Sequence, residues 1–254
     1  MAGGPVIRSD QVLERFSRAA PIYASNALLQ QAMAWRLAQL SRRCAIPRGL
    51  WVDLGSGTGH LATALETCHP GQQVMRVDGS DAMLQSHPRG TRTLRHDLSS
   101  GLPGWPEPPQ LLASSFVLHW LPDPAQQLRS WVNALPDGGW LALAVPVAGS
   151  FPQWQQAARA ANQTCTALTM PMQEHLITAL PDGVVQREEC LSFSQHAANP
   201  LRLLRPMSSI GASVTNGGRL STGQWKAVFK AWPQSDHAPG FALTWRMLIL
   251  MVKR

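Results

Sequence analysis

The sequence predicts an α/β fold with a doubly wound, mainly parallel sheet. Short apolar runs that suit buried strands alternate with helical patterns along residues 46–150. A glycine-rich loop joins the first of these strands to the next helix, as at the ligand-binding edge of many α/β sheets. The length of 254 residues suits one large domain, or one domain with a small appendage.

The core elements follow one another in a regular order. The expected strands lie at residues 50–54, 73–78, 91–97, 111–118 and 140–147. The helix after the fourth strand should have Asp123 as its N-cap and Pro124 at its first position. Because strands alternate with helices, the sheet should be parallel with right-handed crossovers.

The flanking segments add helices on both sides of this core. Residues 1–45 are expected to form a helical lid, since residues 10–45 show helical periodicity on either side of Pro21. Residues 46–254 should form the remaining domain, with a helical insertion at about 196–235 and a long apolar strand at about 241–252.

The glycine loop has the spacing of a nucleoside-binding site. The run V-D-L-G-S-G-T-G places Gly55, Gly57 and Gly59 between a strand and a helix, where glycine permits a tight turn and close approach of a ligand. A dinucleotide fingerprint would need a third glycine at position 60, which is His60. Asp78 ends the next strand, where a carboxylate can accept hydrogen bonds from both ribose hydroxyls.

This arrangement resembles the first two motifs of the class I S-adenosylmethionine-dependent methyltransferases, whose fold is a seven-stranded, Rossmann-like sheet. The resemblance implies S-adenosylmethionine as the cofactor, with Asp78 on its ribose and Asp97 at its adenine amine. The positions that it implies at the cofactor are Asp53, Gly55, Ser56, Gly57, Thr58, Gly59, Asp78, Gly79, Ser80, Met83, Asp97, Leu98, Ser115 and Phe116. Ser115 and Phe116, which end the fourth strand, would lie near the reactive methyl group.

The flanks resemble one family of methyltransferases. The segments RFSRAAPIYASNALLQQ, SSFVLHWLPDP and LLRPMSSIGAS are similar to the malonyl-acyl-carrier-protein O-methyltransferase (BioC) family, and the similarity covers about residues 11–254. It implies methylation of the free carboxylate of a malonyl thioester on acyl carrier protein, which primes pimeloyl synthesis for biotin. Two positions depart from the family pattern, since Ala24 stands where Asp is usual and Ser208 where Lys is usual.

Three side chains are candidates for the substrate site. Tyr23, the only tyrosine, could bind a substrate carboxylate through its phenol or serve as a packing aromatic. Arg205 could hold the malonyl carboxylate or lie in solvent, and Arg202 shares its helix face three residues before. His119, beside Trp120 at the edge of the sheet, is a candidate as a base or as a wall of the pocket.

The expected reaction needs no strong base. An unperturbed carboxyl group titrates near ~4, so the acceptor is already ionised at neutral pH. The enzyme would then act by positioning and desolvation rather than by proton transfer. The ligands should lie at the carboxyl ends of the parallel strands, with the N-terminal helices closing over them.

The positive charge lies on the flanks of the chain. The net charge is +7, yet residues 46–150 hold six basic and eight acidic side chains. An excess of arginine also fits a GC-rich genome. An acidic carrier protein would explain the charge as electrostatic steering. The candidate contacts are Arg202, Arg219, Lys226 and Lys230.

Other partners and ligands find less support. The four cysteines are widely spaced and no Cys/His cluster has zinc spacing, so no metal is expected. No apolar run reaches the ~18 residues of a membrane span, and no signal-peptide pattern is present, so a cytoplasmic protein with no membrane partner is expected. The oligomeric state stays open.

Three alternative functions compete with methylation of a malonyl thioester. A class I methyltransferase could act on another small carboxylic acid or on a quinone. A degenerate methyltransferase fold could only bind a carrier protein. A nucleic-acid methyltransferase would fit the charge, but the fourth strand lacks the Asn/Asp-Pro-Pro-aromatic motif, so no nucleic acid is expected. The sequence leaves open whether carrier protein is preferred over CoA.

Overall fold

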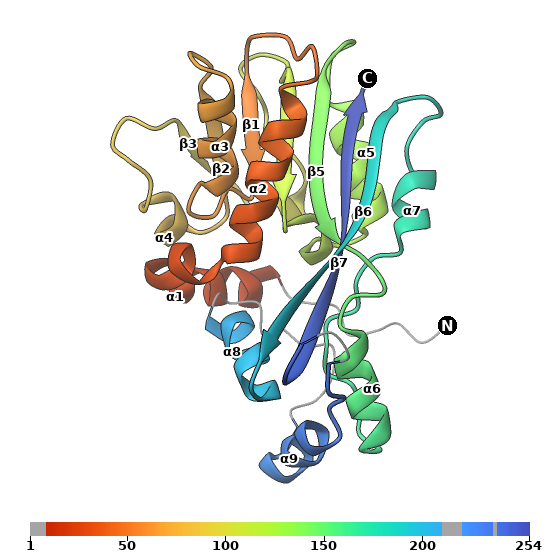
Figure 1. The fold of residues 1–254 in the computed structure, drawn as a ribbon. Helices are drawn as coiled ribbons and strands as arrows, with labels where there is room; N and C mark the ends of the chain where they lie inside the picture. The colour runs from red at the N-terminus through yellow and green to blue at the C-terminus, as the bar shows by residue number, and fades with distance from the viewer. Residues whose placement is uncertain (1–8, 210–219, 236–237) are drawn as a thin grey trace.

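The computed structural model describes residues 9–209, 220–235 and 238–254, which form one seven-stranded sheet with helices on both faces (Figure 1). The strands, in chain order, are β1 (Trp51–Leu54), β2 (Val74–Asp78), β3 (Thr93–Arg95), β4 (Leu111–Ser115), β5 (Trp140–Pro146), β6 (Val185–Ala197) and β7 (Phe241–Lys253). The sheet order is β3-β2-β1-β4-β5-β7-β6. The strands β1 to β5 are parallel, and β7 pairs antiparallel with both β5 and β6.

The helices precede, connect and follow these strands. They are α1 (Ser9–Asn26), α2 (Leu28–Ser41), α3 (His60–Cys68), α4 (Asp81–Leu84), α5 (Pro124–Asn133), α6 (Pro152–Ala160), α7 (Gln173–Thr178), α8 (Pro200–Ser209) and α9 (Thr222–Lys230). Two short 3-10 helices are η1 (Leu98–Ser100) and η2 (Leu118–Trp120). Within the described residues, no helix has both the length and the apolar character needed to cross a bilayer.

The central strands are buried on both faces, which explains their continuous apolar runs. On one face, Trp51 and Ala142 pack with Leu37 of α2 and Leu65 of α3. On the other face, a second apolar cluster includes Trp131 of α5 and Leu176 of α7. Helices therefore cover both sides of the sheet, as the predicted doubly wound fold requires.

The parallel strands all end at the same edge of the sheet, and α1 and α8 lie beyond that edge (Figure 1). This edge is where ligands bind in open α/β sheets. The two 13-residue strands β6 and β7 extend past it, so they link the sheet to the helices α6, α8 and α9.

Three elements differ from the sequence-based expectation. The strand expected at 111–118 ends at Ser115, because Phe116 has a left-handed φ of 60°, which stops the extended backbone. The helix α1 continues through Pro21 instead of ending there. The helix α7 was not expected from the sequence. Asp123 does cap α5, with Pro124 in its first turn.

Parts of two predictions lie outside the described residues. Residues 210–213 of the family segment LLRPMSSIGAS fall there, and so does Arg219, one of the expected carrier-protein contacts. The proposed lid begins in the structure at Ser9.

Candidate active site

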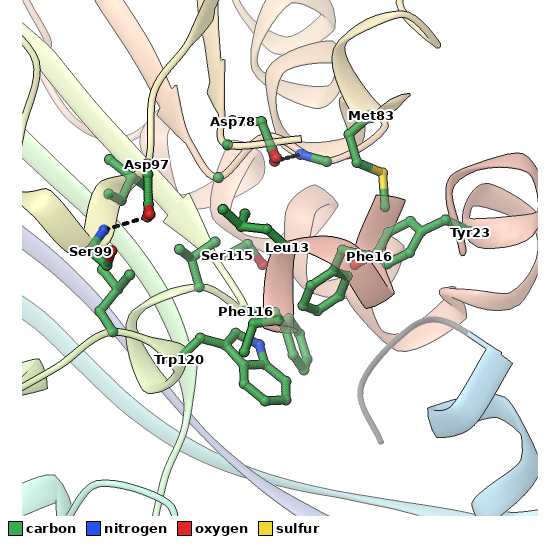
Figure 2. Close-up of a pocket in the computed structure, with 17 residues that line it drawn as sticks. Leu13, Phe16, Tyr23, Asp78, Met83, Asp97, Ser99, Ser115, Phe116 and Trp120 are labelled. Carbon is green, nitrogen blue, oxygen red and sulfur yellow. Dashed lines mark hydrogen bonds between the residues drawn. The ribbon is translucent and has the colours of Figure 1, made fainter. Parts of the chain in front are cut away.

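A cavity lies at the carboxyl edge of the sheet (Figure 2). Its walls come from the glycine loop, the ends of β2 and β4, α4, η1, η2 and the covering helix α1. The predicted cofactor residues that line it are Gly55, Gly57, Asp78, Gly79, Met83, Asp97, Leu98, Ser115 and Phe116. The structure therefore brings together residues that are more than 60 positions apart in the chain.

The glycine loop approaches the cavity closely because it carries no side chains at two positions. Gly55 and Gly57 have positive φ values of 71° and 52°, a conformation that favours glycine. A Cβ atom on Gly55 would lie 2.3 Å from a methyl carbon of Val117, so a larger residue there would displace the wall. The loop is thus built for contact between backbone and ligand.

Asp78 fixes the glycine loop to the end of β2. Its Oδ2 accepts a hydrogen bond from the backbone N–H of Gly57 at 2.8 Å, and its Oδ1 accepts one from the N–H of Ser80 at 2.8 Å. Burial raises the pKa of this carboxyl group, and the backbone hydrogen bonds oppose that rise. The carboxylate lines the cavity at the position expected for the ribose hydroxyls.

Asp97 has the equivalent position after β3. Its Oδ1 accepts a hydrogen bond from the N–H of Ser99 at 2.9 Å, which caps the short helix η1 (Figure 2). Asp97, Leu98 and Ser99 all line the cavity. The two strand-end acids lie on one side of it, and the aromatic rings of Phe16, Phe116 and Trp120 gather on another.

Five predicted cofactor residues do not line the cavity, and most support its walls. Asp53 lies beneath the loop, where its Oδ2 accepts a hydrogen bond from the N–H of Ala62 in α3 at 3.0 Å. Burial raises the pKa of Asp53 to about 7. Gly59 is the N-cap of α3, and the hydroxyl of Ser80 caps α4. The hydroxyl oxygens of two others are buried without a partner in the described structure: Ser56 and Thr58.

The helix α1 covers the cofactor side of the cavity. A Cβ atom on Gly79 would lie 2.6 Å from Cδ2 of Leu13, and the hydroxyls of Ser17 and Ser80 are 2.7 Å apart. Leu13 and Phe16 line the cavity. Neither residue was predicted from the sequence to line the site, although their apolar spacing on one helix face was a signal for burial.

A second, smaller chamber adjoins the first. The two share the residues Phe16, Tyr23, Phe116 and Trp120. The chamber is completed by Gln30, His119, Leu168, Met170, Met207 and Trp245. Its wall is mainly apolar, and the phenol, amide and imidazole groups of three residues supply its polar character.

Tyr23 and His119 are both held in their neutral forms. Burial raises the pKa of the Tyr23 phenol, and the charges of Asp78 and Asp53 raise it further, so the hydroxyl stays protonated. His119 is 7% exposed, and burial lowers its pKa to about 3. Its Nδ1 has no hydrogen-bond partner among the described residues. Neither side chain is therefore poised as a charged acid or base at neutral pH.

Arg205 does not reach this chamber in the structure. It is exposed on the outer face of α8, together with Arg202. Leu203 and Met207 occupy the opposite, inward face, and Met207 lines the chamber. Arg205 does not line the chamber in the described structure, and its contact with the substrate carboxylate stays a prediction.

The arrangement fits S-adenosylmethionine. The glycines leave room for a ligand against the backbone, and Asp78 presents a carboxylate where a ribose would lie. The hydroxyl of Ser115 lines the cavity and has no partner among the described residues, so a ligand could satisfy it. Within those residues, no three His, Cys, Asp or Glu side chains form a group that could hold a metal ion.

Fold and site together define a class I methyltransferase that uses S-adenosylmethionine. The chain belongs to the methyltransferase domain family, whose model matches residues 26–181. A putative methyltransferase from Bacillus halodurans has a similar structure, with a TM-score of 0.60 and 13% identity, covering 85% of this chain and 97% of that one.

Curated relatives narrow the similarity within that family and confirm the resemblance found from the sequence. The chain is 29% identical to malonyl-[acyl-carrier protein] O-methyltransferase from Alcanivorax borkumensis, over 98% of this chain and 89% of the relative. It is also 28% identical to the biotin biosynthesis bifunctional protein BioCD from Bordetella avium, over 89% of this chain and 49% of that protein.

Proposed function

We propose that the protein transfers a methyl group from S-adenosylmethionine to the free carboxylate of a malonyl thioester carried by acyl carrier protein. The product is the malonyl methyl ester, an uncharged primer for the pimeloyl chain of biotin. Esterification removes the negative charge that an elongation enzyme with an apolar primer site would reject. The similarity to malonyl-[acyl-carrier protein] O-methyltransferase supports this substrate, and the similarity to the biotin biosynthesis protein BioCD supports this pathway.

One observation carries the proposal. The chamber beside the cofactor cavity is built largely by segments outside the glycine-loop core, including Tyr23 and Gln30 before it and Met207 and Trp245 after it. The match to the malonyl-acyl-carrier-protein methyltransferase extends over 98% of the chain, so it includes these chamber-forming flanks. A similarity due only to a shared cofactor-binding site would be confined to the glycine-loop core and would not extend to these flanks.

The residues suggest how the acceptor is held. The cofactor supplies a methyl group on a positively charged sulfur. The protonated phenol of Tyr23 and the amide of Gln30 can donate hydrogen bonds to a carboxylate or thioester oxygen in the chamber. The aromatic rings of Phe16, Phe116 and Trp120 exclude water at the boundary of the two cavities. A carboxylate that has lost part of its water shell is a better nucleophile.

No proton transfer is required of the protein. The acceptor is ionised before it enters, and the neutral His119 does not need to remove a proton from it. The chain's contribution is to orient one carboxylate oxygen toward the cofactor cavity and to keep water out.

A substrate panel tests the proposal. Initial rates of methyl transfer should be measured with malonyl carrier protein, acetyl carrier protein, a small tricarboxylic acid and a quinone. We expect transfer to the malonyl thioester, and none to the acetyl thioester, which lacks the free carboxylate. A higher kcat/KM on the tricarboxylic acid or the quinone would contradict the proposal. Tight binding of S-adenosylmethionine without transfer to any acceptor would favour a binding protein instead.

A further inference from the structure

One end of the molecule carries a concentrated positive charge. The helices α6, α8 and α9 gather beyond the carboxyl edge of the sheet (Figure 1). None of these three helices contains an Asp or Glu residue. Their exposed cations, which we call the basic lobe, are Arg159, Arg202, Arg205, Lys226 and Lys230.

No ion pair among the described residues includes a cation of the basic lobe, whereas some cations elsewhere are paired, as in Arg36–Glu189 and Arg95–Asp81. A protein surface ordinarily mixes charges of both signs. A patch of one sign on one end therefore produces a directed field that reaches about a Debye length, ~8 Å at physiological salt.

The basic lobe is packed against the active site. Met207, on the inner face of α8, lines the acceptor chamber, while Arg202 and Arg205 lie on the outer face of the same helix. The rings of Trp154 in α6 and Trp225 in α9 are 5.9 Å apart, so these two helices form one packed unit. A partner bound to the outer face of α8 would therefore lie next to the chamber.

Apolar surface accompanies the charge. Leu201 on α8 is 53% exposed, and it lies next to Arg202 in the chain. Ile22 on α1, the helix that packs against α8, is 47% exposed. A protein interface combines apolar contacts with complementary charge, whereas binding to a phosphate backbone depends chiefly on the charge.

We propose that the basic lobe is the docking surface for an acidic carrier protein, which delivers its thioester from there into the acceptor chamber. The inference rests on the proposed function and adds the location of the partner. Complementary charge selects an acidic protein, and the shared helix α8 connects its binding surface with the chamber. Arg202 and Arg205 thus act on the carrier protein rather than on the substrate carboxylate.

Charge reversal at two positions tests this inference. The variant Arg202→Glu/Lys226→Glu should be assayed with malonyl carrier protein and with malonyl-pantetheine, which has the same thioester on a neutral arm. We expect KM for the carrier protein to rise by about tenfold or more, since each lost charge contact slows encounter or speeds release. The kcat value and the kinetics on malonyl-pantetheine should stay within about twofold.

A matched control separates local from general charge effects. Arg43→Glu/Arg48→Glu makes the same change in net charge on two exposed residues before β1, at the opposite end of the sheet. It should leave KM for the carrier protein nearly unchanged. The inference would be overturned if KM for the carrier protein rose equally in both double variants. It would also be overturned if KM rose equally for the carrier protein and for malonyl-pantetheine.

Two further outcomes have distinct meanings. If the wild-type protein methylates malonyl-pantetheine but the lobe variant keeps its normal KM for carrier protein, the docking surface is wrong while the proposed function stands. If a short DNA duplex binds the wild-type protein and not the lobe variant, with carrier-protein kinetics unchanged in both, the lobe binds nucleic acid and the inference fails. Transfer to neither thioester would instead refute the proposed function.

Discussion

Asp78 links the glycine loop to the ligand cavity through a single carboxylate. Both oxygens are oriented by backbone N–H groups at 2.8 Å, so the group is fixed before a cofactor binds. Preorganised acceptors of this kind lose little entropy on binding, and hydrogen bonds to a charged group contribute about 1.5–3 kcal/mol each. This residue should therefore control affinity for the cofactor more strongly than it controls turnover.

Replacing Asp78 with Asn tests that role. Asn keeps one oxygen for the backbone but loses the charge, so the dissociation constant for S-adenosylmethionine should rise by about tenfold or more in a calorimetric titration. Asp81→Asn, on an exposed residue of α4, is the control and should bind normally. An Asp78→Asn protein with wild-type affinity would show that the carboxylate does not hold the ribose.

His119 provides a second test at the residue scale. Its neutral, buried imidazole has an Nδ1 atom without a partner in the described structure, so we expect it to orient the acceptor and not to act as a base. His119→Gln retains hydrogen-bonding capacity and should keep most of the activity. His119→Leu should raise KM for the malonyl thioester by about tenfold, consistent with one lost hydrogen bond to a charged group.

The pH profile separates the two roles of His119. Because its pKa is lowered to about 3, the imidazole does not titrate near neutral pH, and kcat/KM should be flat from about pH 6 to 8. A base would instead give a rate that falls as the pH drops through its pKa. A rate loss near pH 6.5 that disappears in His119→Gln would contradict the positioning role.

At this scale, the sequence predicted which strand-end residues line the cavity, but not which way Arg205 faces. Asp78 and Asp97 could be placed because each follows a parallel strand, and parallel strands end at one edge of the sheet. The direction of Arg205 depends on how α8 rotates against its neighbours, which only tertiary packing determines. The isolation of the His119 imidazole is likewise a property of the folded core.

The helix α1 is the element that closes the site. Leu13 and Phe16 form part of the cavity wall, and Ser17 bonds to the Ser80 hydroxyl, so ligand exchange should require this helix to move. Deleting residues 1–26 should leave a cooperatively folding protein by thermal unfolding, because the sheet and its main apolar clusters remain. Turnover should fall by about a hundredfold as water enters the site. Full activity in the truncated protein would refute the role of α1 as a lid.

The carboxyl group of Asp53 makes the first turn of α3 sensitive to pH. Burial raises its pKa in the folded protein to about 7, whereas an unfolded Asp titrates near ~3.9. Between these values the folded state binds more protons, so the free energy of unfolding falls as pH rises toward 7. The substitution Asp53→Asn removes this fall in the free energy of unfolding, and its amide oxygen can still accept a hydrogen bond from the N–H of Ala62.

Urea denaturation at two pH values measures the effect. The stability of Asp53→Asn relative to wild type should increase between about pH 5 and pH 8, by on the order of 2 kcal/mol. A difference in unfolding free energy that does not change with pH would show that Asp53 titrates normally in the folded protein.

Element boundaries were predicted less well than element order. The alternation of strands and helices gave the core order because each buried strand needs a helix to cover it. The end of β4 was missed because FVL continues an apolar run, while the backbone of Phe116 turns out of the strand. The helix α1 passes through Pro21, although proline cannot donate an intrahelical hydrogen bond.

At the scale of the whole molecule, the glycine-loop core and the basic lobe differ in the sign of their charge. The glycine-loop core, residues 46–150, has more acidic than basic side chains, and the basic lobe has no acidic residue in its helices. Such a field should accelerate the encounter with an acidic partner and should be screened by salt.

The salt dependence of the reaction follows from this separation. As ionic strength increases from about 20 to 300 mM, kcat/KM for malonyl carrier protein should fall severalfold. The value for malonyl-pantetheine should change much less, because its one carboxylate interacts with the field of the lobe less strongly than a whole acidic protein does. Parallel salt curves for the two substrates would contradict electrostatic steering.

The central claim is that a methyl group is added to the free carboxylate of a malonyl thioester. Intact-mass spectrometry of malonyl carrier protein after incubation with enzyme and S-adenosylmethionine tests it most directly. The account predicts a gain of one CH₂ unit on the malonyl form and no gain on acetyl carrier protein. An unchanged mass of the malonyl form, with the cofactor shown to bind, would contradict it.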